Sequence, residues 1–398
     1  MRYPLLSNAF SKKDLIEGHK VLKSKQITMS TKTLLFEKKF ANYMGVKYGV
    51  MVNSGSSANL LALSLITNPM RERKLNIGDE VIIPVICWST SLWPIIQHGL
   101  RPIFVDININ NINIDIEKIE SSITKRTKAI FCVHVLGLST NMTKIKKIAR
   151  KHNLIIIEDT CESFGSKFMN KFLGTFGEVG TFSFYYSHQI TSGEGGMIIC
   201  KSKKDYEILL SLRSHGWARE KFIQKKYKKK YANLDSRFLF VNSGYNLRPT
   251  EIQAAIALSQ FKRKDIFKNN RTHNRELIIK RVLRDKCYSG QISFLKVEKK
   301  IEPSWFGMVI IINKKFVNKK REYLDYLHKK GIETRPIISG NFINQPAIKL
   351  YGLNKKKYNF KNAQMIENQG FFIGLHTQKM SIKLVEYVAK NLLKINEI

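Results

Sequence analysis

The amino-acid sequence predicts an α/β protein in which a large domain is built on a mostly parallel β-sheet. Several short segments in the first half of the chain are apolar throughout, as strands buried on both faces of a sheet are. These segments are residues 48–52, 80–84, 101–105, 129–135 and 154–158. Amphipathic segments such as 59–66 and 142–152 lie between them and predict helices. Strands that alternate with helices are typical of a parallel sheet covered by helices on both faces.

The pattern changes near residue 255, which predicts a second, smaller domain. A basic segment at 252–282 is expected to be helical. The strands and the helix predicted beyond it lie at 291–297, 307–312 and 321–330. We therefore predict a large α/β domain over residues 1–255 and a small α+β domain over residues 256–398. No long Gly-, Ser- or Pro-rich linker separates the two, so they are expected to pack directly on each other.

The formal net charge of +37 admits two interpretations. A strongly basic protein attracts anionic partners such as nucleic acid, a membrane surface or a nucleotide-linked substrate. Here, however, the basic residues are spread along the chain. The densest run, 225–230, is predicted to be a loop and has no nucleic-acid-binding motif beside it. We therefore favour a lysine-coated surface and expect no nucleic-acid partner, while the charge stays compatible with a diphosphate-bearing substrate.

The cysteines and the N-terminus favour a cytoplasmic protein. The five cysteines lie far apart and contain no Cys-x-x-Cys pair, so neither a disulfide framework nor a metal site is expected. The N-terminal residues reach charge at Lys12 and Lys13 without a signal-peptide core. No apolar run approaches the roughly 18 residues that cross a bilayer, so we expect no membrane partner.

A candidate phosphate-binding turn follows the first predicted strand. Its sequence, Asn-Ser-Gly-Ser-Ser-Ala-Asn at 53–59, opens a predicted helix. Gly55 lets the backbone approach a ligand closely, and the Ser56 hydroxyl and the free N–H groups at a helix N-terminus bind phosphate well. An ordinary helix N-cap after a strand is an equally good interpretation of this segment alone.

A second candidate lies at the end of the strand predicted at 154–158. Asp159 follows this strand and begins a polar segment that continues to Glu162. Open α/β sheets bind their ligands at the carboxyl ends of the strands. A buried carboxylate needs a partner, and a protonated pyridine nitrogen would serve. The alternative is a structural acid that caps a following helix.

A third candidate is His188, which lies in a polar turn between two predicted strands. The turn ends in Gly-Glu-Gly-Gly at 193–196, and an apolar strand follows at 197–200. A lone histidine is more often a structural hydrogen-bonding residue than a catalyst. The position of His188 between two strands and beside glycines favours a functional role.

In this order, the three segments resemble the DegT/DnrJ/EryC1/StrS sugar aminotransferases of the fold-type-I pyridoxal phosphate class. Arg-Ser-His-Gly-Trp at 213–217 and Gly-Tyr-Asn-Leu-Arg-Pro at 244–249 match the same family, so the resemblance covers nearly the whole chain. Within the family, Cys-Trp-Ser-Thr at 87–90 and Phe-Tyr-Tyr-Ser-His at 184–188 look most like the 3-dehydratases that act on GDP-linked 4-keto-6-deoxymannose.

The resemblance implies which side chains would hold pyridoxal 5′-phosphate or its amine form, pyridoxamine 5′-phosphate. The phosphate contacts would be Gly55, Ser56, Ser183 and, from a neighbouring subunit, Asn246. The contacts with the ring would be Trp88, Asp159 and Glu162. Candidate contacts with the substrate are His215, Arg248 and Arg335. A site shared in this way implies a homodimer. For Trp88 and His215 a purely structural role is the alternative.

His188 is the position at which the resemblance decides the activity. The aminotransferases of the family bind their cofactor covalently through a lysine, and counting from Ser183 places His188 where that lysine would be. The cofactor would therefore be held noncovalently, with glutamate as the amino donor. The imidazole, titrating near neutrality, would act as the general base. The implied activity is that of a lyase that removes the C3 hydroxyl of a nucleotide-linked 4-keto-6-deoxy sugar, on the route to 3,6-dideoxy sugars.

Other activities stay open at this point. An aminotransferase would need a base other than the missing lysine. The CDP-linked 3-dehydrases also use histidine, but they carry an iron-sulfur cluster, and no tight Cys-x-Cys cluster is present here. A regulator or a nucleic-acid-binding protein would explain the charge but not the exchange of one catalytic residue for another. The lysine-rich segment 220–240 matches the family poorly, which leaves the nucleotide and the sugar, hexose or heptose, undetermined.

Overall fold

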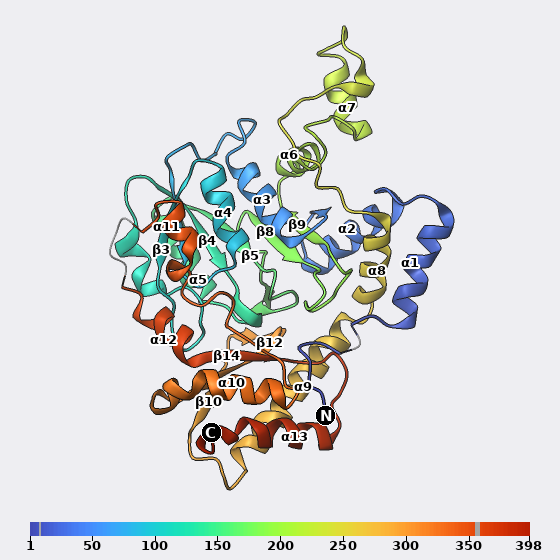
Figure 1. Cartoon of the computed structure of the whole chain (residues 1–398). Coiled ribbons are helices and arrows are strands. Elements are labelled where there is room, and N and C mark those ends of the chain that lie inside the picture. The colour runs from blue at the N-terminus through green and yellow to red at the C-terminus, as the bar shows by residue number, and fades with distance from the viewer. Residues whose placement is uncertain (8, 355–358) are drawn as a thin grey trace.

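Seven strands form the central sheet of the large domain in the computed structural model, which describes residues 1–7, 9–354 and 359–398 (Figure 1). Their order is β1-β9-β8-β5-β4-β2-β3. The bounds are β1 Tyr48–Val52, β2 Glu80–Pro84, β3 Arg101–Val105, β4 Thr127–Val133, β5 Ile155–Asp159, β8 Val179–Ser183 and β9 Gly196–Cys200. β9 runs antiparallel to β1 and β8, and the other pairs are parallel. The sheet is therefore mostly parallel, as predicted, and each apolar segment named above forms a strand to within two residues.

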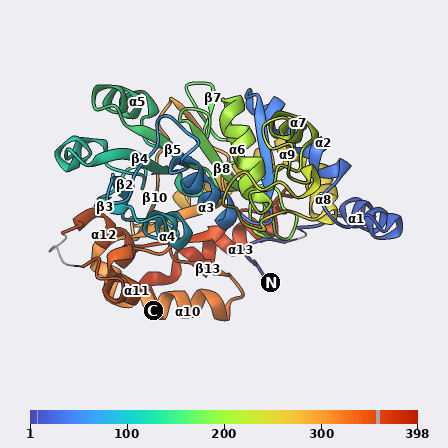
Figure 2. The same ribbon diagram turned by 90° about the horizontal axis from the view of Figure 1, so that it is seen from above.

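Helices cover both faces of this sheet, as Figure 2 shows. On one face lie α3 Gly55–Ile66, α4 Ser89–Gln97 and α6 Lys203–Arg213, and on the other α2 Thr31–Met44, α5 Met142–Lys151 and α8 Glu251–Phe261, with α1 Lys12–Ser24 packed against α8. Successive side chains of a strand point to opposite faces. In β1, for example, Val50 and Val52 pack in the core beneath α3, whereas Met51 packs against α2. Burial on both faces explains why the strand sequences are apolar throughout.

The small domain is an antiparallel sheet in the order β10-β12-β14-β13 with helices packed on it. Its strands are β10 Ile292–Phe294, β12 Gly307–Ile312, β13 Thr334–Arg335 and β14 Gly370–Gly374. Its helices are α9 Lys264–Leu283, α10 Lys320–Lys329, α11 Pro346–Leu350, α12 Lys361–Gln369 and α13 Ile382–Leu392. In Figure 1, α9, α10 and α13 cover the side of the sheet that faces away from the large domain. A short third sheet joins β6 Lys167–Phe168, β7 Lys171–Phe172 and β11 Ile301–Glu302.

Two local predictions were wrong. The helix expected over 252–282 is broken: α8 ends at Phe261 and α9 begins at Lys264. The run at 225–230, expected to be a loop, lies mostly in α7 Lys221–Lys228, which projects from the body in an arm that we define as residues 219–240 (Figure 1). This helix forms because Ile223 is buried on one of its faces, a tertiary contact that the lysine-rich composition hid. In the part of the chain that the structure describes, no helix is long and apolar enough to span a membrane.

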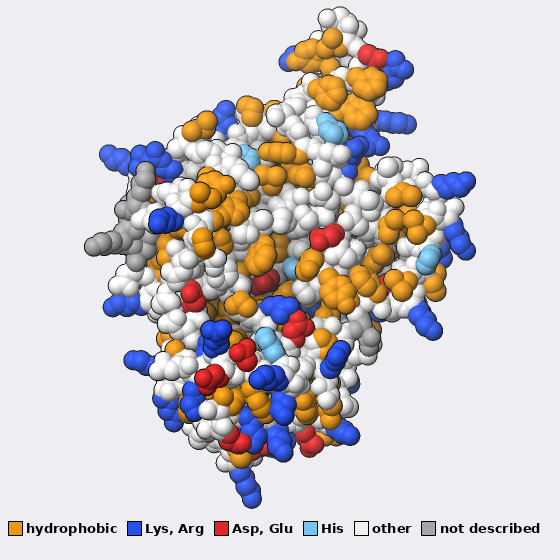
Figure 3. Space-filling view, in the orientation of Figure 1, with side chains coloured by type: hydrophobic (Ala, Val, Ile, Leu, Met, Phe, Trp, Pro, Cys, Tyr) orange, Lys and Arg blue, Asp and Glu red, His pale blue; other side chains and the backbone are white. Residues whose placement is uncertain are grey.

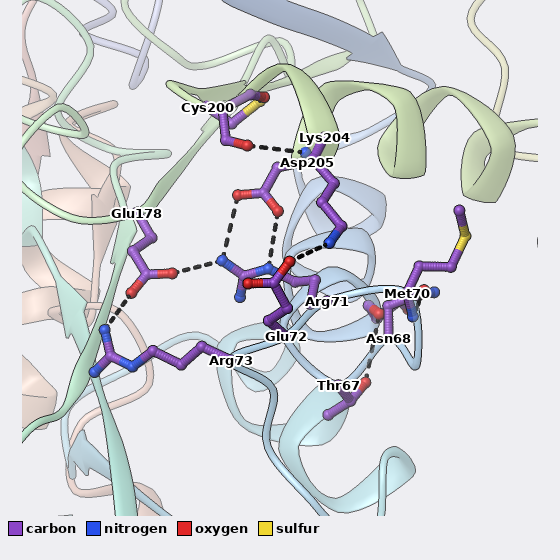
Figure 4. Close-up of polar contacts among 12 residues, drawn as sticks. Thr67, Asn68, Met70, Arg71, Glu72, Arg73, Glu178, Cys200, Lys204 and Asp205 are labelled. Carbon is purple, nitrogen blue, oxygen red and sulfur yellow. Dashed lines mark hydrogen bonds and ion pairs between the residues drawn. The ribbon is translucent and has the colours of Figure 1, made fainter. Parts of the chain in front are cut away.

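A network of ion pairs holds the large domain together at the amino ends of the parallel strands (Figure 4). Arg71, in the loop after α3, donates from Nη2 to Glu178 at 2.6 Å and from Nε to Asp205 at 2.8 Å. The side chains of Arg71 and Asp205 are each only 9% exposed. Burial alone would lower the pKa of Arg71, but the two carboxylates outweigh that effect and raise the pKa. The loop is thereby tied to β8 and α6 by buried charges.

We predict that Arg71→Met lowers the free energy of unfolding by about 3–5 kcal/mol, because the Asp205 carboxylate is left buried without its cation. Urea denaturation followed by circular dichroism measures the loss. The control is Arg73→Met, which removes a 47% exposed partner of Glu178 and should cost less than about 1 kcal/mol. Equal losses in the two variants would contradict this account of the network.

Candidate active site

A cavity of about 530 Å³ lies at the carboxyl ends of β5 and β8, between the large sheet and the small domain. Parallel sheets of this kind bind ligands at that edge. The sequence-predicted residues that line the cavity are Gly55, Ser56, Trp88, Asp159, Glu162, Ser183, His188 and Arg335. They come from positions up to 280 residues apart and are brought together by the crossover connections of the sheet and by the small domain.

The other three predicted residues form a separate group on the surface and are not part of the cavity wall. Arg248 donates from Nε to Oδ1 of Asn246 at 3.0 Å, and its Nη2 lies 3.5 Å from Nε2 of His215. Ser214 and Asn246 are also joined by a β-bridge. None of these three side chains is among the residues that line the cavity.

The first turn of α3 presents free backbone N–H groups to the cavity. The helix begins at Gly55 and is capped by Ser54, whose side chain accepts from the N–H of Ser57. Because Ser54 is the cap, Gly55 and Ser56 are available to a ligand, and their N–H groups lie where a helix binds phosphate. A Cβ atom on Gly55 would lie 2.5 Å from the Cβ atom of Ser183. Only glycine therefore allows α3 to approach the end of β8 this closely.

Asp159, the last residue of β5, is a buried carboxylate without a cationic partner among the described residues. Its Oδ2 accepts from Nδ2 of Asn59 at 2.8 Å and from Oγ of Ser91 at 2.7 Å. Its Oδ1 accepts from the N–H of Cys161 at 3.1 Å. The alternative role, capping a following helix, does not apply, because a turn and the β6–β7 hairpin follow. The carboxylate is oriented by neutral donors and can pair with a cation supplied by a ligand.

Glu162 and Trp88 form further parts of the cavity wall. Burial raises the pKa of Glu162 to about 7, although the N–H of Leu136 donates to the carboxylate and opposes the shift. Glu162 can therefore hold or release a proton near neutral pH. Trp88 is 57% exposed, which excludes the alternative of an ordinary core aromatic. Its ring is free to stack on a flat ligand.

His188 lies in the turn after β8 with its ring edge against an aromatic wall. The imidazole meets the ring of Phe306 at 5.0 Å between centroids, at an interplanar angle of 84°. Its Nδ1 is buried and has no hydrogen-bond partner among the described residues, which leaves Nε2 as the nitrogen that can exchange a proton with a ligand. Burial, together with the charge of Arg271, lowers the pKa of His188 to about 3. This shift runs against the expected titration near neutrality: desolvation of the ring is its main cause, and the charge of Arg271 adds to it.

Sequence reasoning missed His134, which also lines the cavity. It follows β4, and its Nε2 lies 3.0 Å from Oε2 of Glu158. Burial would raise the pKa of Glu158, but the hydrogen bonds from His134, Gly177 and Gly174 outweigh it and lower the pKa. Nε2 of His134 and the Glu158 carboxylate thus share a hydrogen bond, while Nδ1 of His134 lacks a partner among the described residues. The available signal was a histidine near the end of the buried strand predicted at 129–135, beside the strand that carries Asp159.

Comparisons with known proteins agree with this geometry. A model of the DegT/DnrJ/EryC1/StrS aminotransferase family matches residues 9–393. The GDP-4-keto-6-deoxy-D-mannose 3-dehydratase of Escherichia coli O55:H7 is 39% identical over 381 residues, covering 94% of this chain and 96% of that enzyme. The enzyme of the same name from Yersinia pseudotuberculosis is 36% identical and covers 99% of this chain and 98% of its own length.

The fold is likewise similar to that of a solved structure. The Escherichia coli GDP-4-keto-6-deoxy-D-mannose-3-dehydratase with bound hydrated PLP superposes with a TM-score of 0.87. It is 35% identical, and the match covers 98% of this chain and 99% of that one. The expected fold class, a large parallel-sheet domain with a smaller α+β domain, is confirmed by this likeness and by the arrangement of the strands.

We predict that Gly55→Ala lowers the free energy of unfolding by about 1–3 kcal/mol, since its Cβ atom would overlap Ser183 and force α3 away from β8. Ser56→Ala in the same turn adds no atom at this contact and should change stability by less than about 0.5 kcal/mol. Urea denaturation of the ligand-free protein compares the two. An unaffected Gly55→Ala variant would show that the helix can shift without strain.

Proposed function

The chain belongs to the DegT/DnrJ/EryC1/StrS aminotransferase family, and we propose that it is a pyridoxal 5′-phosphate-dependent lyase of the 3-dehydratase type. Its substrate in this proposal is a nucleotide-linked 4-keto-6-deoxy sugar, GDP-4-keto-6-deoxymannose or a close analogue, and glutamate is the amino donor. The two relatives that are 39% and 36% identical bear the name GDP-4-keto-6-deoxy-D-mannose 3-dehydratase. The product would be a precursor of a 3,6-dideoxy sugar.

The observation that carries the proposal is His188 in the cavity, at the position of the family's lysine. Among the described residues that line the cavity there is no lysine. The cofactor would therefore be held by noncovalent contacts alone. The cavity wall fits such a ligand: α3 offers N–H groups for a phosphate, Asp159 has neutral donors and no cation among the residues that the structure describes, and Trp88 presents an exposed ring.

In the proposed complex, different residues of the wall would contact the phosphate and the ring of the cofactor. Gly55, Ser56 and Ser183 would hold the phosphate, and Asp159 would pair with the protonated ring nitrogen. Trp88 would lie against the ring, and Glu162 would lie beside its phenolic oxygen. When bound, the amine form of the cofactor supplies an amino group that condenses with a sugar ketone and a conjugated ring that accepts electrons.

His188 would move the proton on which dehydration depends. A neutral imidazole accepts a proton at Nε2, and the resulting imidazolium can deliver it to a departing hydroxyl, which then leaves as water. The buried position near Arg271 keeps the ring neutral before the reaction. A histidine also cannot attach covalently to the cofactor aldehyde, as a lysine does, and so favours loss of the hydroxyl over amine transfer.

An aminotransferase is the second candidate function. A GDP-perosamine synthase of Escherichia coli O157:H7 is 34% identical over 304 residues, which cover 76% of this chain. The 3-dehydratase is preferred because the wall of the cavity has a histidine, and no lysine among the described residues, where amine transfer requires one. We also propose that the enzyme works in the cytoplasm, where nucleotide-linked sugars are available.

We predict that His188→Asn retains the cofactor, because the phosphate contacts and Asp159 are untouched, but loses dehydration by about 10²–10⁴-fold. Mass spectrometry of the sugar product follows loss of the C3 hydroxyl, and absorbance of the dialysed protein follows the cofactor. His188→Lys is expected to bind the cofactor covalently and to favour amine incorporation. Dehydration at the wild-type rate in His188→Asn would overturn the proposed role of this histidine.

We further propose a homodimer in which the arm and the surface group around Asn246 complete the partner's site. The arm exposes large hydrophobic side chains, including Phe238 at 67% and Phe240 at 59% (Figure 3). Exposed apolar clusters of this kind mark protein–protein contacts. Asn246 and Arg248 lie next to the arm and outside the cavity of their own chain, so a second copy is the partner to which they are available.

Asn246→Ala should therefore weaken cofactor retention without changing the stability of the fold, since the side chain is exposed and contacts Arg248. Retention is measured from the cofactor remaining after dialysis, and the dimer from light scattering. The control is Ser243→Ala, at another exposed position of this segment. Thr250→Ala would not serve, because Thr250 caps α8. Full activity in a demonstrably monomeric preparation would contradict the shared site.

A further inference from the structure

Arg271 is a buried cation beside the cavity, and it has no ion-pair partner within residues 1–7, 9–354 and 359–398. It lies on α9, the helix that leads into the small domain, and its side chain is among the largest that are fully buried. Its Nη1 donates to the carbonyl oxygen of Trp305 at 3.0 Å, and its Nη2 donates to the carbonyl oxygen of His188 at 3.1 Å. No carboxylate of the described residues pairs with it, and its Nε has no hydrogen-bond partner there. All of its contacts are therefore neutral.

A guanidinium in this setting is unfavourable for stability alone. Burying an ion without a counter-charge is costly even when backbone carbonyls accept its hydrogen bonds. Burial accordingly lowers the pKa of Arg271 to about 10, which still leaves it charged at neutral pH. An apolar side chain of similar length would fill the same space without this penalty. The charge and the two donors therefore require an explanation beyond packing.

The two carbonyl groups that Arg271 binds belong to the two segments that meet where the rings of His188 and Phe306 are in contact. One belongs to His188 itself, and the other precedes Phe306, whose ring meets the imidazole edge-on at 5.0 Å. Gln189 adds a parallel link, since its Nε2 donates to the carbonyl oxygen of Ser304 at 3.0 Å. Arg271 thus joins the turn after β8 to the start of β12 in the small domain and sets the position of the imidazole between them.

The charge of Arg271 also acts on the imidazole. The other titratable side chains of the cavity wall are His134, Asp159, Cys161, Glu162, Tyr185, Glu194 and Arg335. The pKa of His188 is lowered first by burial and then by the charge of Arg271, and not by the charges of the other groups in the wall. Arg271 lowers the pKa of the nearby buried His376 in the same sense. A fixed positive charge disfavours a protonated neighbour, so it keeps the imidazole in the form that accepts protons.

We propose that Arg271 is a positioning residue for the reaction: its guanidinium anchors the backbone of His188 to that of Trp305 in the small domain and places a fixed positive charge beside the imidazole. The proposal rests on the proposed role of His188 as the base. It adds that the position and the pKa of His188 depend on Arg271, a residue that does not line the cavity. It also couples the base to the small domain, because the same guanidinium binds Trp305.

The test separates charge from hydrogen bonding with a pair of variants. Arg271→Gln keeps an amide donor and removes the charge, whereas Arg271→Lys keeps the charge and loses the planar pair of donors. The matched control is Arg275→Gln, one helical turn further along α9. Arg275 donates to the carbonyl oxygen of Leu295 and stacks on Trp305 at 4.1 Å, but it does not contact His188.

The first readout is the titration of His188 in the cofactor-free protein, followed by NMR with ¹³C-labelled histidine and assigned with His188→Asn. Arg271→Gln should raise the pKa of His188 by at least about 1 unit, while Arg271→Lys and Arg275→Gln should leave it near the wild-type value. Equal pKa values in Arg271→Gln and the wild type, or equal shifts in Arg271→Gln and Arg271→Lys, would overturn the electrostatic part of the proposal. This readout does not depend on the reaction, so it stands even if the sugar dehydration fails in every preparation.

The second readout is the pH profile of dehydration in the holoenzyme. The acid limb of kcat/KM should move to higher pH in Arg271→Gln and stay in place in Arg271→Lys. Arg271→Lys should instead lose about tenfold in kcat at all pH values with KM unchanged, because one carbonyl contact is lost and the base is misplaced. An Arg271→Lys variant with wild-type kcat would overturn the positioning part, and it does so even if Arg271→Gln does not fold.

Discussion

The buried carboxylate of Asp159 is the constraint on which the site depends. Its donors come from α3 through Asn59, from α4 through Ser91, and from the turn that it begins. A buried charge is tolerated only when such donors are in place. The carboxylate therefore fixes both helices against the end of β5. With α3 in this position, its N-terminus lies against Ser183, a contact so close that glycine is required at position 55. One electrostatic requirement thus places both a helix N-terminus that could receive a phosphate and a carboxylate that could pair with a ring nitrogen.

The ionisable groups of the cavity are held in different states by their surroundings. Hydrogen bonds from His134, Gly177 and Gly174 lower the pKa of Glu158 against the effect of burial, whereas burial raises the pKa of Glu162 to about 7. His188 is neutral because it is buried near Arg271. Environments that push the pKa values of neighbouring groups apart are typical of sites that perform acid–base chemistry. In the proposed function, the lowered pKa of His188 would suit a neutral base, and the pKa of about 7 would let Glu162 exchange protons near neutral pH.

The same family fold serves amine transfer and dehydration, so the activity has to be argued from the site and not from the fold. His188 lies where the resemblance to the family places a lysine, so in the proposed function the cofactor would be held noncovalently. The first turn of α3, Asp159 and Trp88 line the same cavity and could contact it. The small domain contributes Phe306 and Arg335 to the same cavity. The position of the small domain therefore affects the position of His188, through the ring contact with Phe306 and through the guanidinium of Arg271.

The sequence by itself determined the strands, the helices that alternate with them and the order of the motifs, because burial on both faces leaves continuous apolar segments and ligand sites follow strand ends. It also identified Gly55, Asp159 and His188 as candidates, since each stands where a strand gives way to a polar turn. Only the tertiary structure showed that His134 and Arg271 belong to the same region. His134 is paired with Glu158, which is distant in the sequence. Arg271 binds backbone carbonyl groups, of His188 and Trp305, which no side-chain pattern reveals. The tertiary structure alone also decided the protonation state of the imidazole, because a pKa depends on burial and neighbouring charge, which no local pattern of residues specifies.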